Sequence, residues 1–600
     1  MPLRNHRRQE FCVGRGDPCG RPGVGFFGHL VWFGAVNVGT REGCPYGITE
    51  GRNFAWVGAT LAVALGLVFV DVFLENASMN QELRRKVGQL FMVGFDALEA
   101  NDHIIRMIRE QRVGGIVLFR RNVYTPEQVS TLCQQLQEIN ATVSDEPLLI
   151  ALDQEGGMVM RVEQGMTPIP AAMAFQAAGS VDSCEKLNAI NGDEIRQIGI
   201  NMFLAPVLDV NNNRNNPVIG LRAYDEEPNN VIKYGMAAVR GLRSAGMIAT
   251  AKHFPGHGDT STDTHYDIAS VPHDRARLNA VELAPFKAAI AEGVDAIMTA
   301  HVMFPAIELD INLPATLSKA VLTDLLRGEM GFKGVVISDC LEMAAISEGV
   351  GVAQGAVATL QAGSDIVLIS HQEERQLAAI EMVIQAVLRG DISMARIDEA
   401  LARVRQLKQV SAVRLWRKRA LKPPSLMRPE ALALAKKIQK AALQVQGNFR
   451  PLDVNEIVTL ITIEVRTRSE IDEVALARNK EARSSILPGL LQAGMTVREY
   501  ALSVEATDDE IAGALAFAEG AQQIVIQTYN ATLIEGQRRL LAALPQDKLW
   551  LVAGRLPYDL DLAPLAQGRL AGYGCRPAAL APVVEKLVSA HLDMRRVNVG

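Results

Sequence analysis

The sequence contains few cysteines, and their spacing excludes a disulfide framework and a compact zinc module. The seven cysteines form no CxxC pair and no short-range cluster with histidine. The last four, Cys133, Cys184, Cys340 and Cys575, are expected to be free thiols in packed positions. The net charge is only −6, which gives no reason to expect nucleic acid or an acidic membrane surface as a partner. The chain also lacks internal repeats and long low-complexity tracts.

Residues 1–79 differ from the rest of the chain. Residues 1–53 are rich in Gly and Arg and lack regular periodicity, and an uninterrupted apolar run follows over residues 54–70. The run is short for a bilayer span and slightly long for the core of a signal peptide, so it could be an anchor or a signal. The alternative is a poorly ordered segment, or sequence translated upstream of a true start at Met79. Localisation therefore stays open between cytoplasmic and membrane-anchored or extracytoplasmic, with membrane contact only through residues 54–70.

At 600 residues, 48% hydrophobic and 21% charged, the chain is expected to form two or three globular domains. Over residues 80–410, short apolar strands alternate with amphipathic helices, which fits a parallel (β/α)8 barrel or a doubly wound sheet. Polar residues follow many different strands, and this favours a TIM-type barrel, whose active site lies at the strand C-termini. The expected strands are Leu90–Phe95, Gly115–Phe119, Leu148–Leu152, Met202–Val207, Ile248–Lys252, Ala296–Ala300, Gly334–Ser338 and Asp365–Ile369.

A second α/β, sandwich-like domain is expected over residues 450–600. Residues 411–449 form a helical linker, which the break Lys422-Pro423-Pro424 interrupts. Strands recur after it at Ile457–Ile463, Gln523–Gln527 and Leu549–Ala553. This part of the sequence shows no Gly-rich phosphate loop and no obvious polar cluster.

The densest chemical signal runs from Lys252 to His265, with the sequence KHFPGHGDTSTDTH. It begins at the end of an expected strand, and its Pro and Gly residues allow a sharp turn. A hydrogen-bonded loop with incidental histidines is one reading, and a metal site of His253, His257 and His265 is another. The helical HExxH spacing is missing, and the pair Asp263-x-His265 suits an oriented acid/base better.

Three further polar segments follow expected strands. Asp339 directly follows the strand GVVIS, although a carboxylate at such a position can also cap a helix. Asp153-Gln154-Glu155-Gly156-Gly157 follows the strand LLIAL, and VIGLR ends in Arg222 after an Asn-rich stretch.

Taken together, KHFPGHG followed by DTH, with DQEGG, APVLDV, VIGLR and VISDCLEM, resembles glycoside hydrolase family 3. More narrowly, the chain resembles the bacterial β-N-acetylhexosaminidase branch of that family. The resemblance covers about residues 85–410, and a second α/β domain is found in many members. It implies hydrolysis of terminal non-reducing β-linked N-acetylglucosamine through a covalent glycosyl-enzyme, with retention of configuration. The implied partner is a carbohydrate, such as an N-acetylglucosamine oligosaccharide or a muropeptide of cell-wall recycling.

The resemblance also implies roles for single residues. Asp339 is then the nucleophile, His265 the general acid/base and Asp263 the partner that orients it. The sugar hydroxyls would be held by Asp153, Arg161, Arg222, Lys252 and His253. This scheme needs no cofactor and no metal, because a carboxylate and an imidazole supply both attack and proton transfer. Imidazole in place of a second carboxylate departs from the general glycosidase scheme.

A few positions depart from the family pattern, and rival functions remain. Gln154, Met158, Met160 and Cys340 stand where other residues are usual, and they are expected to retune the pocket beyond the first sugar. A β-glucosidase or β-xylosidase of the same family would take its acid from the second domain, whereas here the Asp263/His265 pair supplies it locally. A phosphorylase is also open, since a histidine repels phosphate less than a glutamate does. The alternative that is not an enzyme is a sugar-binding protein without catalytic activity. The leaving group of the natural substrate and the oligomeric state stay undetermined.

Overall fold

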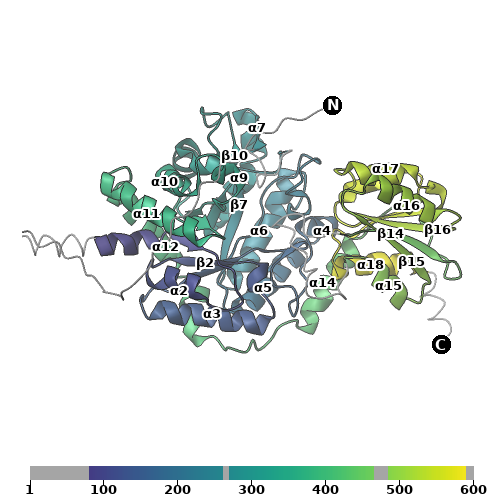
Figure 1. Cartoon of the computed structure of the whole chain (residues 1–600), viewed down its shortest axis with the longest axis horizontal. Coiled ribbons are helices and arrows are strands. Elements are labelled where there is room, and N and C mark those ends of the chain that lie inside the picture. The colour runs from purple at the N-terminus through teal and green to yellow at the C-terminus, as the bar shows by residue number, and fades with distance from the viewer. Residues whose placement is uncertain (1–79, 261–268, 465–483, 590–600) are drawn as a thin grey trace, which may run out of the picture. The chain divides into compact units, whose positions relative to one another are not determined.

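An eight-stranded parallel sheet closes into a barrel in the first half of the chain (Figure 1). The computed structural model describes residues 80–260, 269–464 and 484–589, all of which belong to one unit spanning residues 74–600. The barrel strands are β1 (Phe91–Val93), β2 (Gly115–Leu118), β3 (Leu149–Leu152), β6 (Met202–Phe203), β7 (Ile248–Phe254), β9 (Ala296–Thr299), β11 (Val335–Ile337) and β12 (Val367–Ile369).

Hydrogen bonding joins these strands in the order β11-β9-β7-β6-β3-β2-β1-β12, and a parallel bridge between Ile337 and Ile366 closes the circle. Every residue of the barrel strands is buried, because the inside of the barrel and the surrounding helices cover both faces. All eight strand C-termini consequently open on one end of the barrel.

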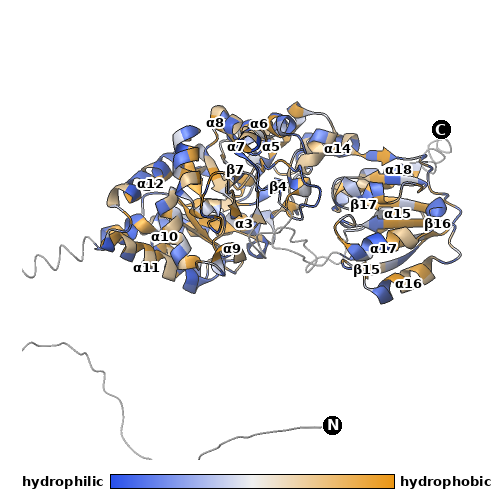
Figure 2. Cartoon of the chain, turned by 90° about the horizontal axis from the view of Figure 1, so that it is seen from above, coloured by the Kyte–Doolittle hydropathy of each residue, from blue (hydrophilic) through white to orange (hydrophobic). Residues whose placement is uncertain are grey.

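Helices between the strands form the outer layer, and their two-coloured surfaces show the amphipathic pattern (Figure 2). A ten-residue π-helix, η4 (Ala320–Glu329), takes the place of an α-helix before β11. The α-helices are α2 (Asp102–Arg109), α3 (Pro126–Ala141), α4 (Ala172–Ala177), α5 (Val181–Gln197), α6 (Pro228–Ser244), α7 (Arg275–Ala280), α8 (Ala284–Glu292), α9 (Ala344–Ser347), α10 (Val352–Ala362), α11 (Glu373–Arg389) and α12 (Met394–Leu407). Two short strand pairs lie in the loops: β4 (Gln154–Gly156) pairs antiparallel with β5 (Val159–Met160), and β8 (Ala269–Ser270) pairs parallel with β10 (Val302–Met303).

The second domain is a six-stranded sheet covered by helices on both faces. Its strand order is β13-β18-β17-β16-β14-β15, parallel throughout except for β13 against β18. The strands are β13 (Gln444–Gln446), β14 (Val458–Glu464), β15 (Val497–Ser503), β16 (Gln523–Thr528), β17 (Leu549–Ala553) and β18 (Gly568–Ala571). The helices are α14 (Pro429–Ala442), which precedes β13, and α15 (Leu487–Gln492), α16 (Asp508–Ala518), α17 (Glu535–Ala543) and α18 (Pro577–Leu587).

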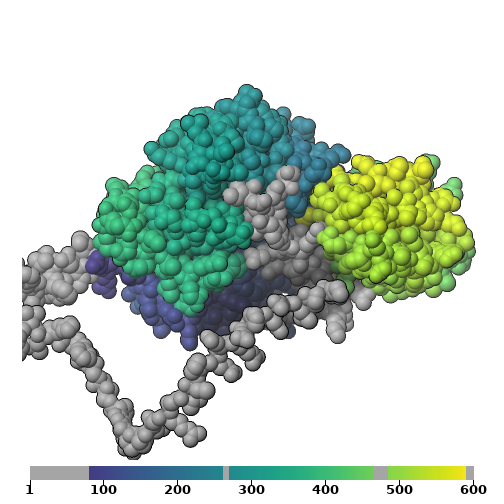
Figure 3. Space-filling view, turned by 45° about the horizontal axis from the view of Figure 1, so that its top comes forward, coloured from purple at the N-terminus to yellow at the C-terminus, as the bar shows by residue number. Residues whose placement is uncertain are grey.

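Strand residues of this second sheet alternate between two apolar layers, as the two-residue period of a strand requires. Ile461 and Ile526 pack with α16 and α17, whereas Leu460 and Val525 pack with α15 and α18. Figure 1 shows the two pairs of helices on opposite sides of the sheet. In the space-filling view, the barrel residues (purple to green) and the second-domain residues (yellow) each form a continuous body (Figure 3).

The fold predicted from the sequence, a (β/α)8 barrel followed by an α/β sandwich, is confirmed. Strand β6 is shorter than predicted, because Pro206 has no N–H to donate to a neighbouring strand. The described cysteines are all free, as expected. The boundaries after residues 79, 410 and 449 stay predictions. Residues 1–79, with the apolar run, lie outside the described residues, and within those no helix is long and apolar enough to cross a membrane.

Candidate active site

One pocket opens at the C-terminal end of the barrel, and charged side chains from six different strands or loops line it. Lys252 and His253 belong to the end of β7, Asp153 follows β3, and Asp339 follows β11. Arg222 lies in the 3-10 turn η2 (Gly220–Arg222) after β6. The pocket is lined by Phe119, Asp153, Glu155, Val159, Arg161, Leu204, Val218, Arg222, Lys252, His253, His257, Met298, Asp339, Cys340, Met343, Leu368, Ser370 and His371.

The buried ammonium of Lys252 lies between two carboxylates. Its Nζ is 2.7 Å from Asp153 Oδ1 and 2.7 Å from Glu155 Oε1, and the side chain is only 2% exposed. Arg161 Nη2 lies 3.3 Å from Asp153 Oδ2, and Arg222 binds Glu155 through two parallel hydrogen bonds of 2.9 and 2.8 Å. Three cations thus face two anions, so the cluster carries a net positive charge when all groups are ionised.

These carboxylates stay ionised in spite of their burial. Desolvation opposes the charged form of Asp153, but Lys252 and Arg161 outweigh it and lower the pKa of Asp153 below its usual range. The pKa of Glu155 is likewise lowered, to about 2, because Arg222 and Lys252 overcome the desolvation. The cluster therefore presents fixed charged acceptors and donors at neutral pH, which suits ligand hydroxyl groups that both donate and accept.

Asp209 organises the turn that carries the histidines. This fully buried carboxylate accepts hydrogen bonds from the amides of His253 (3.3 Å) and His257 (2.6 Å) and from His253 Nδ1 (2.7 Å). His253 Nε2 lies 3.4 Å from Arg222 Nη2, and because a guanidinium can only donate, Nε2 is the acceptor. His253 is thereby held as the Nδ1–H tautomer with Nε2 directed to the pocket. A metal ion at Nε2 would lie against the Arg222 guanidinium, which argues against the three-histidine metal reading.

The Asn-rich stretch before Arg222 holds this turn from the other side. The carboxamide of Asn216 donates to the carbonyls of His257 and Gly258 and accepts from the amides of Val218 and Ile219. Gly258 must be glycine, because an added Cβ would lie 1.7 Å from the carbonyl oxygen of Val210. The asparagine thus joins the loop of Arg222 to the turn after β7.

The main chain around Asp339 is fixed by hydrogen bonds from β9 and its loop. The amide of Asp339 donates to Thr299 Oγ1 (3.3 Å), and the amide of Cys340 donates to Asp339 Oδ1 (2.7 Å). His301 is buried, and its Nε2 donates to the Cys340 carbonyl (2.9 Å), while its Nδ1 contacts Thr316 Oγ1 (2.8 Å). Thr316 in turn contacts Thr299 Oγ1 (2.8 Å), so a continuous network positions the carboxylate.

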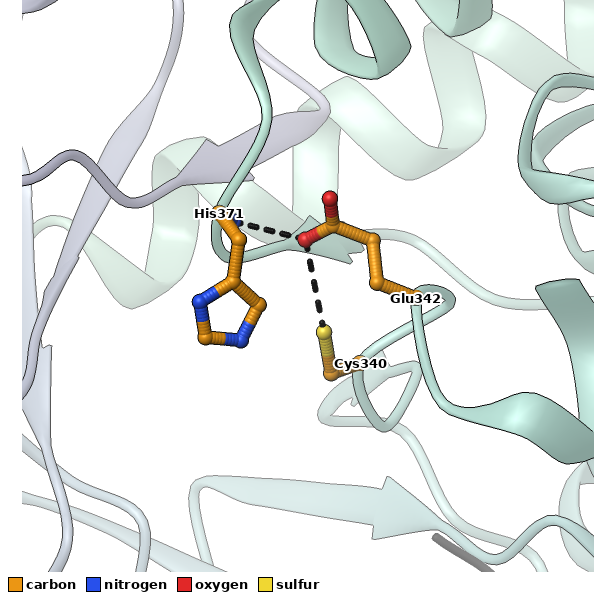
Figure 4. Close-up of side chains that lie close together, drawn as sticks. All are labelled: Cys340, Glu342 and His371. Atoms are coloured by element: carbon orange, nitrogen blue, oxygen red, sulfur yellow. Dashed lines mark hydrogen bonds between the residues drawn. The ribbon is translucent and has the colours of Figure 1, made fainter. Parts of the chain in front are cut away.

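Cys340, Glu342 and His371 lie together beside Asp339 and are all residue types that bind metals (Figure 4). Glu342 Oε2 already accepts from the amides of Ser370 (2.8 Å) and His371 (2.6 Å), and Oε1 accepts from the amide of Gln372 (3.0 Å). Helix α11 begins at Glu373, so this carboxylate holds the main chain that leads into the helix. Burial raises the pKa of the Cys340 thiol to about 12, so the sulfur is protonated.

The second domain contacts two of the site loops. Arg576 Nη2 donates to the carbonyl of Met158, in the β4–β5 hairpin that begins with Gln154 (2.7 Å). Tyr558 Oη accepts from Asn211 Nδ2 (2.9 Å), in the loop that leads to Arg222. These contacts give the second domain a part in positioning Glu155 and Arg222.

Six residues predicted for the site line this one pocket: Asp153, Arg161, Arg222, Lys252, His253 and Asp339. Asp263 and His265 lie within 261–268, outside the described residues, so their placement stays a prediction. The sequence reasoning assigned no role to Glu155, Asp209, His301 or Glu342. Glu155, Asp209 and Glu342 stand within the motifs DQEGG, APVLDV and VISDCLEM, which were the available signal; His301 stands in none of these motifs.

Comparison with known proteins gives one consistent relationship. The family description "Glycosyl hydrolase family 3 N terminal domain" matches residues 82–407. The chain is similar to "Beta-hexosaminidase A" of Pseudoalteromonas piscicida, with 36% identity over 55% of this chain, and it spans 59% of that protein's length. It is also similar to a "Beta-hexosaminidase" of Stenotrophomonas maltophilia, with 38% identity over 47% of this chain and 84% of the relative.

A solved structure of a "glycoside hydrolase family 3 beta-N-acetylglucosaminidase" from Paenibacillus sp. is similar over both domains. The two chains share 43% identity with a TM-score of 0.79, covering 84% of this chain and 96% of the other.

The burial of His257 predicts a dependence of stability on pH. Burial lowers the pKa of His257 to about 4, from an ordinary value of 6.5. Between pH 6.5 and 4 the unfolded chain therefore binds a proton that the native state does not, and stability falls as the pH falls, by about 3 kcal/mol in all. His257→Gln should flatten this fall in urea denaturation midpoints measured from pH 7 to 4.5. His103→Gln, at a half-buried histidine away from the pocket, controls for the loss of one histidine. Equal slopes for wild type and His257→Gln would contradict the assignment.

Proposed function

Because this chain belongs to glycosyl hydrolase family 3, we propose that it hydrolyses terminal non-reducing β-linked N-acetylglucosamine with retention of configuration. One observation carries the proposal: a single pocket brings Asp339 together with the charged cluster around Lys252. A cluster of fixed donors and acceptors can hold sugar hydroxyls while a carboxylate attacks the anomeric carbon. The choice of sugar follows the relatives, which are named beta-hexosaminidase and beta-N-acetylglucosaminidase.

In this scheme Asp339 is the nucleophile. One carboxylate oxygen forms the bond to the anomeric carbon as the bond to the leaving oxygen breaks, and a glycosyl ester results. The Cys340 amide binds Oδ1, and the Thr299 hydroxyl binds the Asp339 amide, so the carboxylate is oriented before substrate arrives. Water then gives up a proton as it attacks the anomeric carbon, the bond to the Asp339 oxygen breaks, and the sugar is released with its original configuration.

The leaving oxygen needs a proton, and His265 with Asp263 is proposed to supply it. An imidazole near its ordinary pKa can donate a proton in the first step and accept one from water in the second. Asp263, two residues before it, favours the protonated ring and fixes its tautomer. The charged residues of the pocket are assigned to the sugar: Asp153, Arg161, Arg222, Lys252 and His253. Glu155 is a positioning residue, since both of its oxygens are engaged by Arg222 and Lys252.

The substrate is proposed to be the non-reducing end of an N-acetylglucosamine oligosaccharide or a muropeptide. The two rival activities, a β-glucosidase or β-xylosidase and an N-acetylglucosaminide phosphorylase, differ in the sugar or in the acceptor. Phosphorolysis would place a dianion next to the Asp339 carboxylate, and Asp339 itself already offsets the single excess positive charge of the cluster around Lys252.

A panel of aryl glycosides separates these activities. The nitrophenyl β-glycosides of N-acetylglucosamine, glucose and xylose are compared with and without inorganic phosphate. We expect turnover of the N-acetylglucosaminide, with free sugar as the product in both buffers. Asp339→Asn removes the attacking charge at unchanged volume and should lower the rate by several orders of magnitude. Sugar 1-phosphate as the main product, or a preference for glucoside or xyloside, would contradict the proposal.

The role of His265 predicts a dependence on the leaving group. Protonation of the departing oxygen helps an alkoxide greatly and an acidic phenol little, so general acid catalysis matters most for natural substrates. His265→Ala should therefore slow cleavage of a disaccharide by 10²–10⁴-fold, and formation of the glycosyl-enzyme from a nitrophenyl sugar far less, by roughly tenfold or under. The two substrates are compared in pre-steady-state and steady-state assays. An equal loss on both would mean that His265 only positions the sugar.

A further inference from the structure

A second cluster of metal-ligating side chains lies outside the pocket, where the turn after β7 meets α7. Its members are Asp259, which follows that turn, His273, which precedes α7, and Glu282, between α7 and α8. His273 Nε2 lies 2.6 Å from Asp259 Oδ2, and one ligand atom from each of the three residues lies within 4.8 Å of the others. Three segments of chain thus converge on one point.

This cluster is distinguished by the buried carboxylate of Glu282. The side chain is only 3% exposed, yet neither carboxylate oxygen receives a hydrogen bond from the part of the chain that the structure describes. A buried ionised carboxylate without hydrogen bonds is costly, and native structures compensate such groups by pairing or by a metal ion. The base of the Glu282 side chain packs against the turn itself, since a Cβ added at Gly256 would be 2.9 Å from Glu282 Cβ.

The neighbouring groups compensate this carboxylate only in part. Arg277 Nη2 is 3.5 Å from Glu282 Oε1 and 3.7 Å from Asp259 Oδ2, beyond ordinary hydrogen-bond lengths, and its side chain is 36% exposed. Asn212 Nδ2 donates to Asp259 Oδ2 at 3.3 Å, while the other end of that amide, the buried Oδ1, has no partner. The carboxylate of Glu282, which lacks hydrogen-bond donors among the described residues, therefore lies near the pair of His273 and Asp259.

We propose that Asp259, His273 and Glu282 bind a divalent transition-metal ion such as Zn²⁺. Two carboxylates and one imidazole are ligands that Zn²⁺ accepts at 2.0–2.2 Å, with a further position open to the Asn212 carbonyl or to water. Mg²⁺, which prefers oxygen ligands alone, fits the imidazole poorly. Zinc would displace the proton that His273 and Asp259 share, and Arg277 would remain as an outer partner of the carboxylates.

The cluster of Cys340, Glu342 and His371 is a weaker candidate, because three backbone amides already occupy both oxygens of Glu342 (Figure 4). The proposed site is structural and does not rest on the proposed function. Its ion would join the turn after β7 to the segment around α7, two parts of the chain that flank residues 261–268 in the sequence. The expectation that the reaction itself needs no metal is unaffected.

The test measures zinc uptake by the full chain after treatment with a chelator and removal of the chelator. Calorimetric titration with Zn²⁺ should show one ion more for wild type than for Glu282→Gln, which keeps the size of the side chain. His273→Gln should lose the same ion, and both variants should weaken its binding at least tenfold. Cys340→Ser is the matched control at the other cluster and should keep wild-type uptake. Zinc should also raise the Tm of wild type but not that of Glu282→Gln.

Substitution by Co²⁺ gives a second readout that does not depend on folding stability. The absorption spectrum of Co²⁺-loaded Glu282→Gln is subtracted from that of Co²⁺-loaded wild type. The difference should show d–d bands and no sulfur-to-cobalt charge-transfer band. Equal zinc uptake in wild type, Glu282→Gln and His273→Gln would overturn the proposal. So would loss of the ion in Cys340→Ser, which would place it at the other cluster.

Discussion

The pairing of Lys252 with Asp153 and Glu155 is the interaction on which the architecture of the pocket depends. Three charges buried at the C-terminal end of the barrel are tolerated only while each has its partners, because an uncompensated buried charge costs about 3–5 kcal/mol. Lys252 comes from β7 and the two carboxylates come from the chain after β3, so the pairing fixes these segments against one another. Arg222 extends the same constraint to the loop after β6. The groups that we propose to bind the sugar are therefore in place before a substrate arrives.

The rest of the pocket is fixed by hydrogen bonds to the main chain rather than between charges. Asp209 collects two amides and one imidazole from the turn after β7, and Asn216 joins that turn to the loop of Arg222. His301 and Thr299 do the same for the chain around Asp339. Preorganisation of this kind lowers the cost of orienting the reacting groups, which is a large part of enzymatic rate enhancement.

The sequence was sufficient to predict the barrel and most of the pocket, for a physical reason. Apolar strands of a parallel barrel are buried on both faces and read as continuous runs, and polar residues just after them meet at one end. Asp153, Lys252 and Asp339 could be placed together from this rule alone. Roles that depend on pairing between distant segments could not: Glu155 with Arg222 is a contact across 67 residues, and Glu342 binds main-chain amides just before a helix that begins 31 residues later. The early end of β6 could also be predicted from the sequence, because Pro206 has no N–H to donate to a neighbouring strand.

The central claim is that Asp339 forms a covalent bond with the sugar, and trapping of that intermediate tests it most directly. A fluorinated N-acetylglucosaminide with a good leaving group slows hydrolysis of the glycosyl-enzyme more than its formation, so the intermediate accumulates. Peptide mass spectrometry of the trapped protein should show one sugar on the peptide that contains Asp339, and none in Asp339→Asn. A label on Asp153, Glu155 or another carboxylate, with Asp339 unmodified, would contradict the account.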